Sequence, residues 1–91
     1  MITNSSESFE SLRRETAVLM KDLISIKSPY FEENEIMDFV NNWFQKNQMD
    51  SHIHEYADEK VTKFHGKNVV LDMKGGREGP TICLNGHLDT V

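Results

Sequence analysis

The spacing of apolar residues changes once along this chain, near Asp50, and that change constrains the fold more than any other feature. Before Asp50 the apolar residues recur at intervals of three, four or seven, and after it they alternate with polar residues. The first spacing places an apolar stripe along a helix, whereas the second gives a strand with one apolar face. Helices followed by strands predict a layered α/β domain.

Two helices are expected in the first half of the chain. Residues 1–7 are polar and expected to be disordered, and the first helix covers about residues 8–27. Pro29 ends it, because the residue before a proline is pushed out of the helical region. The stripe of this helix comprises Phe9, Leu12, Leu19, Leu23 and Ile26. The second helix covers about residues 33–47 and has a wider apolar face, which we expect in the core: Ile36, Phe39, Val40, Trp43 and Phe44.

Three short strands are expected after Asp50. The first lies around Ile53, and the second covers Asn68–Met73. A glycine-rich turn over residues 74–80 then leads to a third strand, Thr81–Asn85. Because the later strands carry apolar residues on both faces, we expect them in a mixed sheet that is covered on both sides.

Charge and composition exclude several classes of function. The chain has 91 residues, with 10 basic against 15 acidic side chains and a net charge of −5, which argues against a nucleic-acid partner. Its longest apolar runs have four residues, so no membrane-spanning segment is expected. The N-terminus lacks the basic and apolar regions of a secretion signal, and Cys83 has no second cysteine to pair with. These features together predict a cytoplasmic protein.

The clearest chemical pattern lies at residues 84–91. His87 and Asp89 are two residues apart at the carboxyl end of an expected strand, so their side chains project to the same side. In open α/β sheets ligands bind at the carboxyl ends of strands. An imidazole ligates a metal through one nitrogen when its other N–H has an acceptor, which a nearby carboxylate supplies. We expect Gly86 to let the backbone approach such a site, although the pair taken alone also fits a solvated structural role.

The segment Asn85–Val91, NGHLDTV, resembles the first metal-site motif of the zinc-dependent aminoacylase and carboxypeptidase family. That family includes acetylornithine deacetylase and succinyl-diaminopimelate desuccinylase. The segment Leu23–Pro29 with its following acidic helix start, and the strand, turn and strand after Asn68, are similar to the family too. The resemblance implies that residues 8–91 form the N-terminal portion of a larger catalytic domain of the zinc-peptidase type.

The resemblance also implies an activity and roles for two residues. His87 matches a zinc ligand, and Asp89 matches the active-site carboxylate that orients that histidine. A complete site of this family holds two Zn²⁺ ions, which Co²⁺ can replace, and cleaves the amide bond of N-acyl amino acids or small peptides. We expect the other ligands and the general base beyond residue 91, so that the isolated chain is inactive. A homodimer of the full-length protein is compatible with the family.

Two alternatives stay open at the level of sequence. The chain could be a stand-alone α/β module that binds a partner or a single metal without catalysis, or a truncated product without activity. The remaining polar candidates have simpler structural roles. His52 and His54 share an exposed strand face without a third ligand, and His65 is expected in a loop. Cys83 is expected to be buried in the third strand, and Ser28 with Pro29 to end the first helix.

Overall fold

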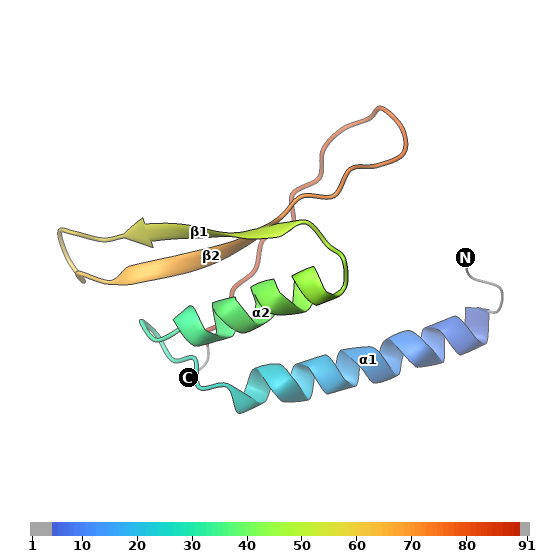
Figure 1. The fold of residues 1–91 in the computed structure, drawn as a ribbon, viewed down its shortest axis with the longest axis horizontal. Helices are drawn as coiled ribbons and strands as arrows, with labels where there is room; N and C mark the ends of the chain where they lie inside the picture. The colour runs from blue at the N-terminus through green and yellow to red at the C-terminus, as the bar shows by residue number, and fades with distance from the viewer. Residues whose placement is uncertain (1–4, 90–91) are drawn as a thin grey trace.

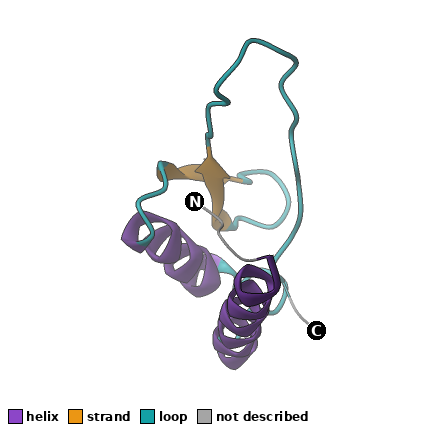
Figure 2. Ribbon diagram, turned by 90° about the vertical axis from the view of Figure 1, so that its right-hand side faces the viewer, coloured by secondary structure: helices purple, strands orange, loops and turns teal. Residues whose placement is uncertain are grey.

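The computed structural model describes residues 5–89, which fold into two helices and one hairpin (Figure 1). The elements are α1 (Ser5–Ser25), α2 (Asn34–Lys46), β1 (Ser51–Ala57) and β2 (His65–Leu71). Helix α2 lies between α1 and the hairpin. A long arc without regular structure leaves β2 and returns to the helices (Figure 2). The predicted α/β class is confirmed.

The hairpin is antiparallel, with Ile53 opposite Val69 and Glu55 opposite Lys67. Its connection is built on Asp58, whose carboxylate accepts hydrogen bonds from the backbone N–H groups of Lys60, Val61 and Thr62 at 3.2 Å. A side chain that binds the following backbone in this way substitutes for a regular turn. These bonds, led by that of the Thr62 N–H, hold the pKa of Asp58 below its ordinary value of 3.8.

Both expected strands of the hairpin exist, with shifted ends. Strand β2 begins at His65 rather than Asn68 and ends at Leu71 rather than Met73. The prediction of His65 in a loop was therefore wrong. The physical reason is the connection over residues 58–64. The Asp58 N–H donates to the Phe64 carbonyl at 2.9 Å, which brings His65 opposite Ala57 and extends the ladder toward the turn. The side chains of His52 and His54 are exposed on the strand face away from α2, as predicted.

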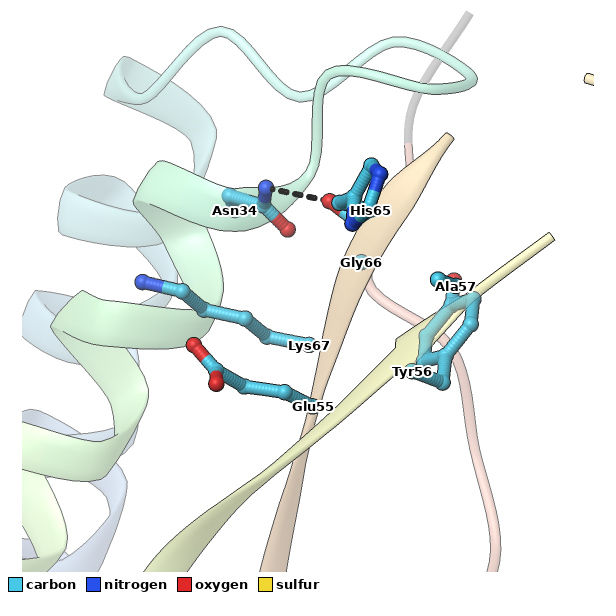
Figure 3. Close-up of a pocket in the computed structure, with 7 residues that line it drawn as sticks. All are labelled: Asn34, Glu55, Tyr56, Ala57, His65, Gly66 and Lys67. Atoms are coloured by element: carbon cyan, nitrogen blue, oxygen red, sulfur yellow. Dashed lines mark hydrogen bonds between the residues drawn. The ribbon is translucent and has the colours of Figure 1, made fainter. Parts of the chain in front are cut away.

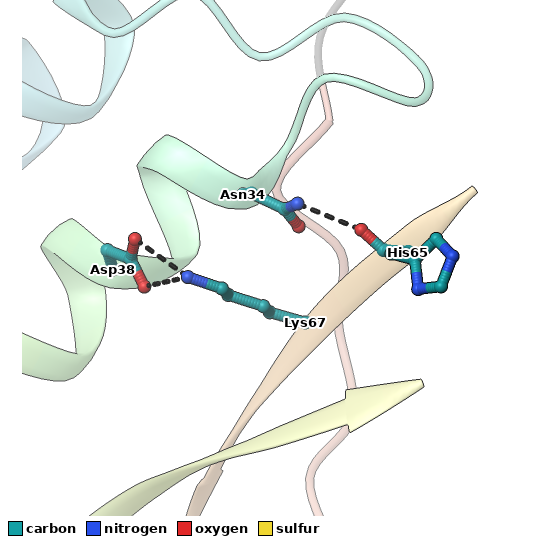
Figure 4. A network of polar contacts seen from close by, with 4 residues as sticks. All are labelled: Asn34, Asp38, His65 and Lys67. Atoms are coloured by element: carbon teal, nitrogen blue, oxygen red, sulfur yellow. Dashed lines mark hydrogen bonds and ion pairs between the residues drawn. The ribbon is translucent and has the colours of Figure 1, made fainter. Parts of the chain in front are cut away.

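Helix α2 covers the other face of the hairpin. Ile36 is 2% exposed and is the buried apolar centre of this contact. Polar pairs flank it. The Lys67 ammonium lies 2.9 Å from a carboxylate oxygen of Asp38 (Figure 4), and the Ser51 hydroxyl donates to the Asn41 side-chain oxygen at 2.8 Å. Apolar burial stabilises the packing of α2 on the hairpin but has no preferred direction. The polar pairs have a defined geometry, so they fix the position of the helix along the strands.

The end of α2 is closed by a left-handed residue, Gln48, with φ of 57°. Its N–H donates to the carbonyl of Gln45 at 3.1 Å, and the Met49 N–H donates to the carbonyl of Phe44 at 3.0 Å. This is the Schellman pattern, which glycine usually provides. Helix α2 therefore ends one residue before the expected position, and the chain turns directly into β1.

Helix α1 begins at Ser5, so residues 5–7 of the terminus expected to be disordered are helical, and residues 1–4 lie outside the described range. Part of its apolar stripe is exposed, because little of α1 packs on the other elements: Phe9, for example, is 76% exposed, and Ile24 beside the stripe is 71% exposed. Among the helices of residues 5–89, none has the length and apolar character needed to cross a membrane.

The expected third strand, Thr81–Asn85, does not form within residues 5–89, and the sheet is two-stranded rather than mixed. A strand needs hydrogen bonds to the N–H and C=O groups of a neighbour. This segment lies on the returning part of the arc, where it lines a cavity with residues 69–71 of β2 without pairing with that strand. Leu84 is accordingly 92% exposed. Cys83, which was expected to be buried, is exposed for the same reason.

We predict that Ile36→Ala lowers the free energy of unfolding by about 2 to 5 kcal/mol, because it removes buried methylenes and leaves a cavity. The matched control is Ile24→Ala, at an exposed position of α1, which should change it by less than about 0.5 kcal/mol. Urea unfolding followed by circular dichroism measures both. Equal losses in the two variants would contradict the assigned core.

We predict that the hairpin connection loosens in acid. A carboxylate whose pKa is lowered by folding stabilises the folded state above its unfolded pKa, and this stabilisation is lost as the pH falls through the folded pKa. The amide signals of Lys60, Val61 and Thr62 should therefore shift together below pH 3.8. Asp58→Asn should abolish that transition, and Glu59→Gln in the same loop should keep it; a midpoint above 3.8 would refute the arrangement.

Candidate functional site

The returning end of the arc lines a hollow beside the beginning of α2. This space, named here the His87 hollow, has a volume of about 170 Å³. Its wall combines the last described residues with the start of α2 and the aromatic end of the hairpin: Glu33, Asn34, Met37, Tyr56, Phe64, Lys67, Asn68, Gly86, His87, Leu88 and Asp89. The fold thus brings the two predicted site residues against side chains from three other segments.

His87 and Asp89 form a close pair at this hollow. The Nδ1 atom of His87 lies 2.6 Å from the Oδ1 atom of Asp89. A carboxylate has no hydrogen to donate, so Nδ1 carries the proton and donates it. In the neutral ring the other nitrogen, Nε2, then keeps its lone pair. The side chain of His87 is 85% exposed, which leaves that nitrogen accessible to a ligand.

This arrangement fits one ligand of a metal centre and does not complete one. A histidine that donates Nδ1–H to a carboxylate is oriented to bind a metal through Nε2, and its basicity is raised. A protein zinc site takes three or four protein ligands. Among residues 5–89 no group of three or more histidine, cysteine, aspartate or glutamate side chains is placed to hold an ion.

A different glycine from the one expected at the site is required by the fold itself. A Cβ atom added to Gly86 would meet no atom of the protein within 4 Å, and the expected approach of this backbone to a bound ligand stays a prediction. At Gly66 an added Cβ would instead collide with the Tyr56 ring and lie 2.7 Å from the Phe64 ring. The aromatic end of the hairpin closes over Gly66, and only the cross-strand pairing of Tyr56 with Gly66 reveals this.

A second cavity of about 370 Å³ lies between α2 and the hairpin (Figure 3). Glu55 and Lys67 project into the space on the α2 side, whereas Tyr56 points to the opposite face of the hairpin. The Asn34 side-chain amide donates to the His65 carbonyl at 2.9 Å, and the Oδ1 atom of Asn34 is buried without a hydrogen-bond partner. Neither His87 nor Asp89 lines this cavity, but it shares Asn34, Tyr56 and Lys67 with the His87 hollow and therefore lies next to it.

Sequence comparison finds similarity to one kind of enzyme. The chain is 34% identical over 74 residues to succinyl-diaminopimelate desuccinylase from Orientia tsutsugamushi, in strains Boryong and Ikeda. The match covers 80% of this chain and 17% of each relative, so the chain spans a small part of the length of these curated relatives. No protein-family model and no solved structure matches it. The similarity supports kinship with a deacylase-type hydrolase over the matched segment.

We predict that Asp89 sets the tautomer of His87. In the wild-type chain at alkaline pH the neutral ring should carry its hydrogen on Nδ1, because the carboxylate accepts from that atom. Asp89→Ala should shift the ring toward the Nε2–H form, as seen in its ¹⁵N signals. His54 is the internal control and should not respond. An unchanged His87 ring in the variant would contradict the pair.

Proposed function

We propose that this chain contributes one zinc ligand, His87, and its orienting carboxylate, Asp89, to an amidohydrolase that deacylates N-acyl amino acids or small peptides. The observation that carries the proposal is the 2.6 Å contact between His87 Nδ1 and Asp89 Oδ1, which leaves Nε2 available. The similarity to a desuccinylase supports the reaction class. The name of that relative makes an N-succinyl amino acid the first substrate to test.

Zinc held by His87 together with further ligands would supply Lewis-acid chemistry at the scissile amide and activate the attacking water. The chain's own residues have a narrower task. In the neutral ring Asp89 holds the hydrogen of His87 on Nδ1, so that Nε2 carries the lone pair and points away from the carboxylate. We assign neither the general base nor the further ligands to residues 5–89, because no third ligating side chain joins the pair there.

The surroundings of the pair are suited to a small molecule. Phe64 and Tyr56 give one wall of the His87 hollow an apolar surface, and Asn34 and Asn68 add polar groups. The volume of about 170 Å³ accommodates part of an acyl amino acid rather than a macromolecule. Polar and charged side chains, Lys67 among them, make up more of the lining than apolar ones, as suits a small ligand that carries charged and hydrogen-bonding groups.

The test measures the metal content and the turnover of the full-length natural polypeptide that contains this chain. We expect bound zinc and hydrolysis of N-succinyl-diaminopimelate or an N-acyl amino acid. His87→Ala should lose zinc and nearly all turnover, whereas His54→Ala, on the exposed strand face, should keep both. Wild-type turnover by His87→Ala, or no bound metal in any variant, would refute the proposal.

We also predict that the purified 91-residue chain does not hydrolyse these substrates at saturating zinc, because one ligand and one orienting carboxylate do not make a reactive centre. Release of the free amine, followed with an amine-reactive dye, measures this. Turnover that depends on zinc and disappears in His87→Ala would show that the chain alone carries a complete site, and the division of roles given above would be wrong.

A further inference from the structure

Ser28 is the most deeply buried polar residue among those described. It lies in the loop between α1 and α2, directly before Pro29, and it is 0% exposed. The sequence pattern indicated only that this position ends a helix. Burying a hydroxyl group is costly unless the group makes hydrogen bonds, so a buried serine on a short loop requires a specific partner.

That partner lies at the predicted metal motif. The Ser28 hydroxyl donates to the carbonyl oxygen of Leu88 at 3.0 Å, across 60 positions of sequence. Leu88 is the residue between His87 and Asp89. Residues 72–87 are exposed throughout, and the chain becomes half-buried at Leu88 and Asp89. The hydrogen bond therefore lies where the returning arc first docks on the helical part of the molecule.

The loop that presents Ser28 is itself held in shape. The Glu32 N–H donates to the Pro29 carbonyl at 2.8 Å and closes a turn. Phe31 adopts a left-handed backbone with φ of 67°, and its N–H donates to the Glu33 carboxylate at 3.1 Å. Proline restricts the backbone further. A donor on such a loop has little freedom to follow a moving acceptor, so it can fix the Leu88 peptide in place.

We propose that Ser28 is a positioning residue that fixes the His87–Asp89 pair through the Leu88 carbonyl. The carbonyl belongs to the peptide group that joins Leu88 to Asp89, so its orientation sets the direction from which the Asp89 side chain approaches the imidazole. Loss of the bond frees this peptide to rotate, and the 2.6 Å contact with His87 is then no longer enforced. This role rests on the proposed function of the pair as a ligand and its orienting group.

The decisive experiment compares Ser28→Ala with a matched control in the 91-residue chain. Ser25→Ala removes a hydroxyl that also donates to a backbone carbonyl, that of Asp22 at 2.7 Å, but at an exposed site within helix α1. In Ser28→Ala we expect the His87 ring to shift toward the Nε2–H tautomer, and Zn²⁺, titrated alone, to bind His87 about tenfold more weakly. The amide signals of β1 and β2 should stay in place, and Ser25→Ala should behave as wild type.

A second variant, Ser28→Cys, keeps nearly the same volume with a weaker donor, so it separates the hydrogen bond from cavity formation. We expect the ¹⁵N signals of the His87 ring in Ser28→Cys to lie between those of the wild type and those of Ser28→Ala. If both Ser28 variants lower thermal stability while the ring keeps its wild-type tautomer, the positioning role is wrong. If instead His87→Ala leaves zinc binding unchanged, the metal function fails while the Ser28 effect on the ring still stands.

Discussion

The packing of α2 on the hairpin is the contact on which the rest of this structure depends. A two-stranded hairpin is marginally stable by itself in water, and a covering helix supplies the apolar contact that it lacks. Ile36 provides the buried centre of that contact, while the Asp38–Lys67 pair and the Ser51–Asn41 bond determine where along the strands the helix sits. Apolar burial alone would allow the helix to slide, because it has no directional preference.

The candidate site follows from this packing and not from one element. Helix α2 places Asn34 at the edge of the His87 hollow, and the hairpin contributes Tyr56 and Phe64. Helix α1 contributes chiefly through the loop that follows it, since Ser28 on that loop holds Leu88. The beginning of its own apolar stripe, Phe9 and Leu12, remains exposed. The segment that carries the predicted His87–Asp89 pair thus receives a hydrogen bond from a residue that was expected only to end a helix.

Local sequence patterns predicted the helices and strands, which depend on neighbouring residues. They failed for strand pairing and burial, which depend on residues far away in the sequence. The helical spacing around Ile36 and the alternation around Ile53 led to α2 and β1, with ends misplaced by a few residues. The Thr81–Asn85 segment has the same kind of alternation, yet it forms no strand, because a ladder needs a partner at the right distance. The predictions for Cys83 and His65 failed for related reasons. The burial of Cys83 and the strand pairing of His65 both depend on which segments of the chain meet in the fold.

The sequence by itself therefore determined two amphipathic helices, the two strands around Ile53 and Val69, and a His-x-Asp pair whose spacing puts both side chains on one side. Helical and strand periodicity and the spacing of two side chains are properties of a short stretch of chain, so they can be read there. Tertiary structure alone decided that Gly66 must lack a side chain, and that Ser28 meets the carbonyl of Leu88. These contacts join residues far apart along the chain, and such contacts exist only once the fold has brought their partners together.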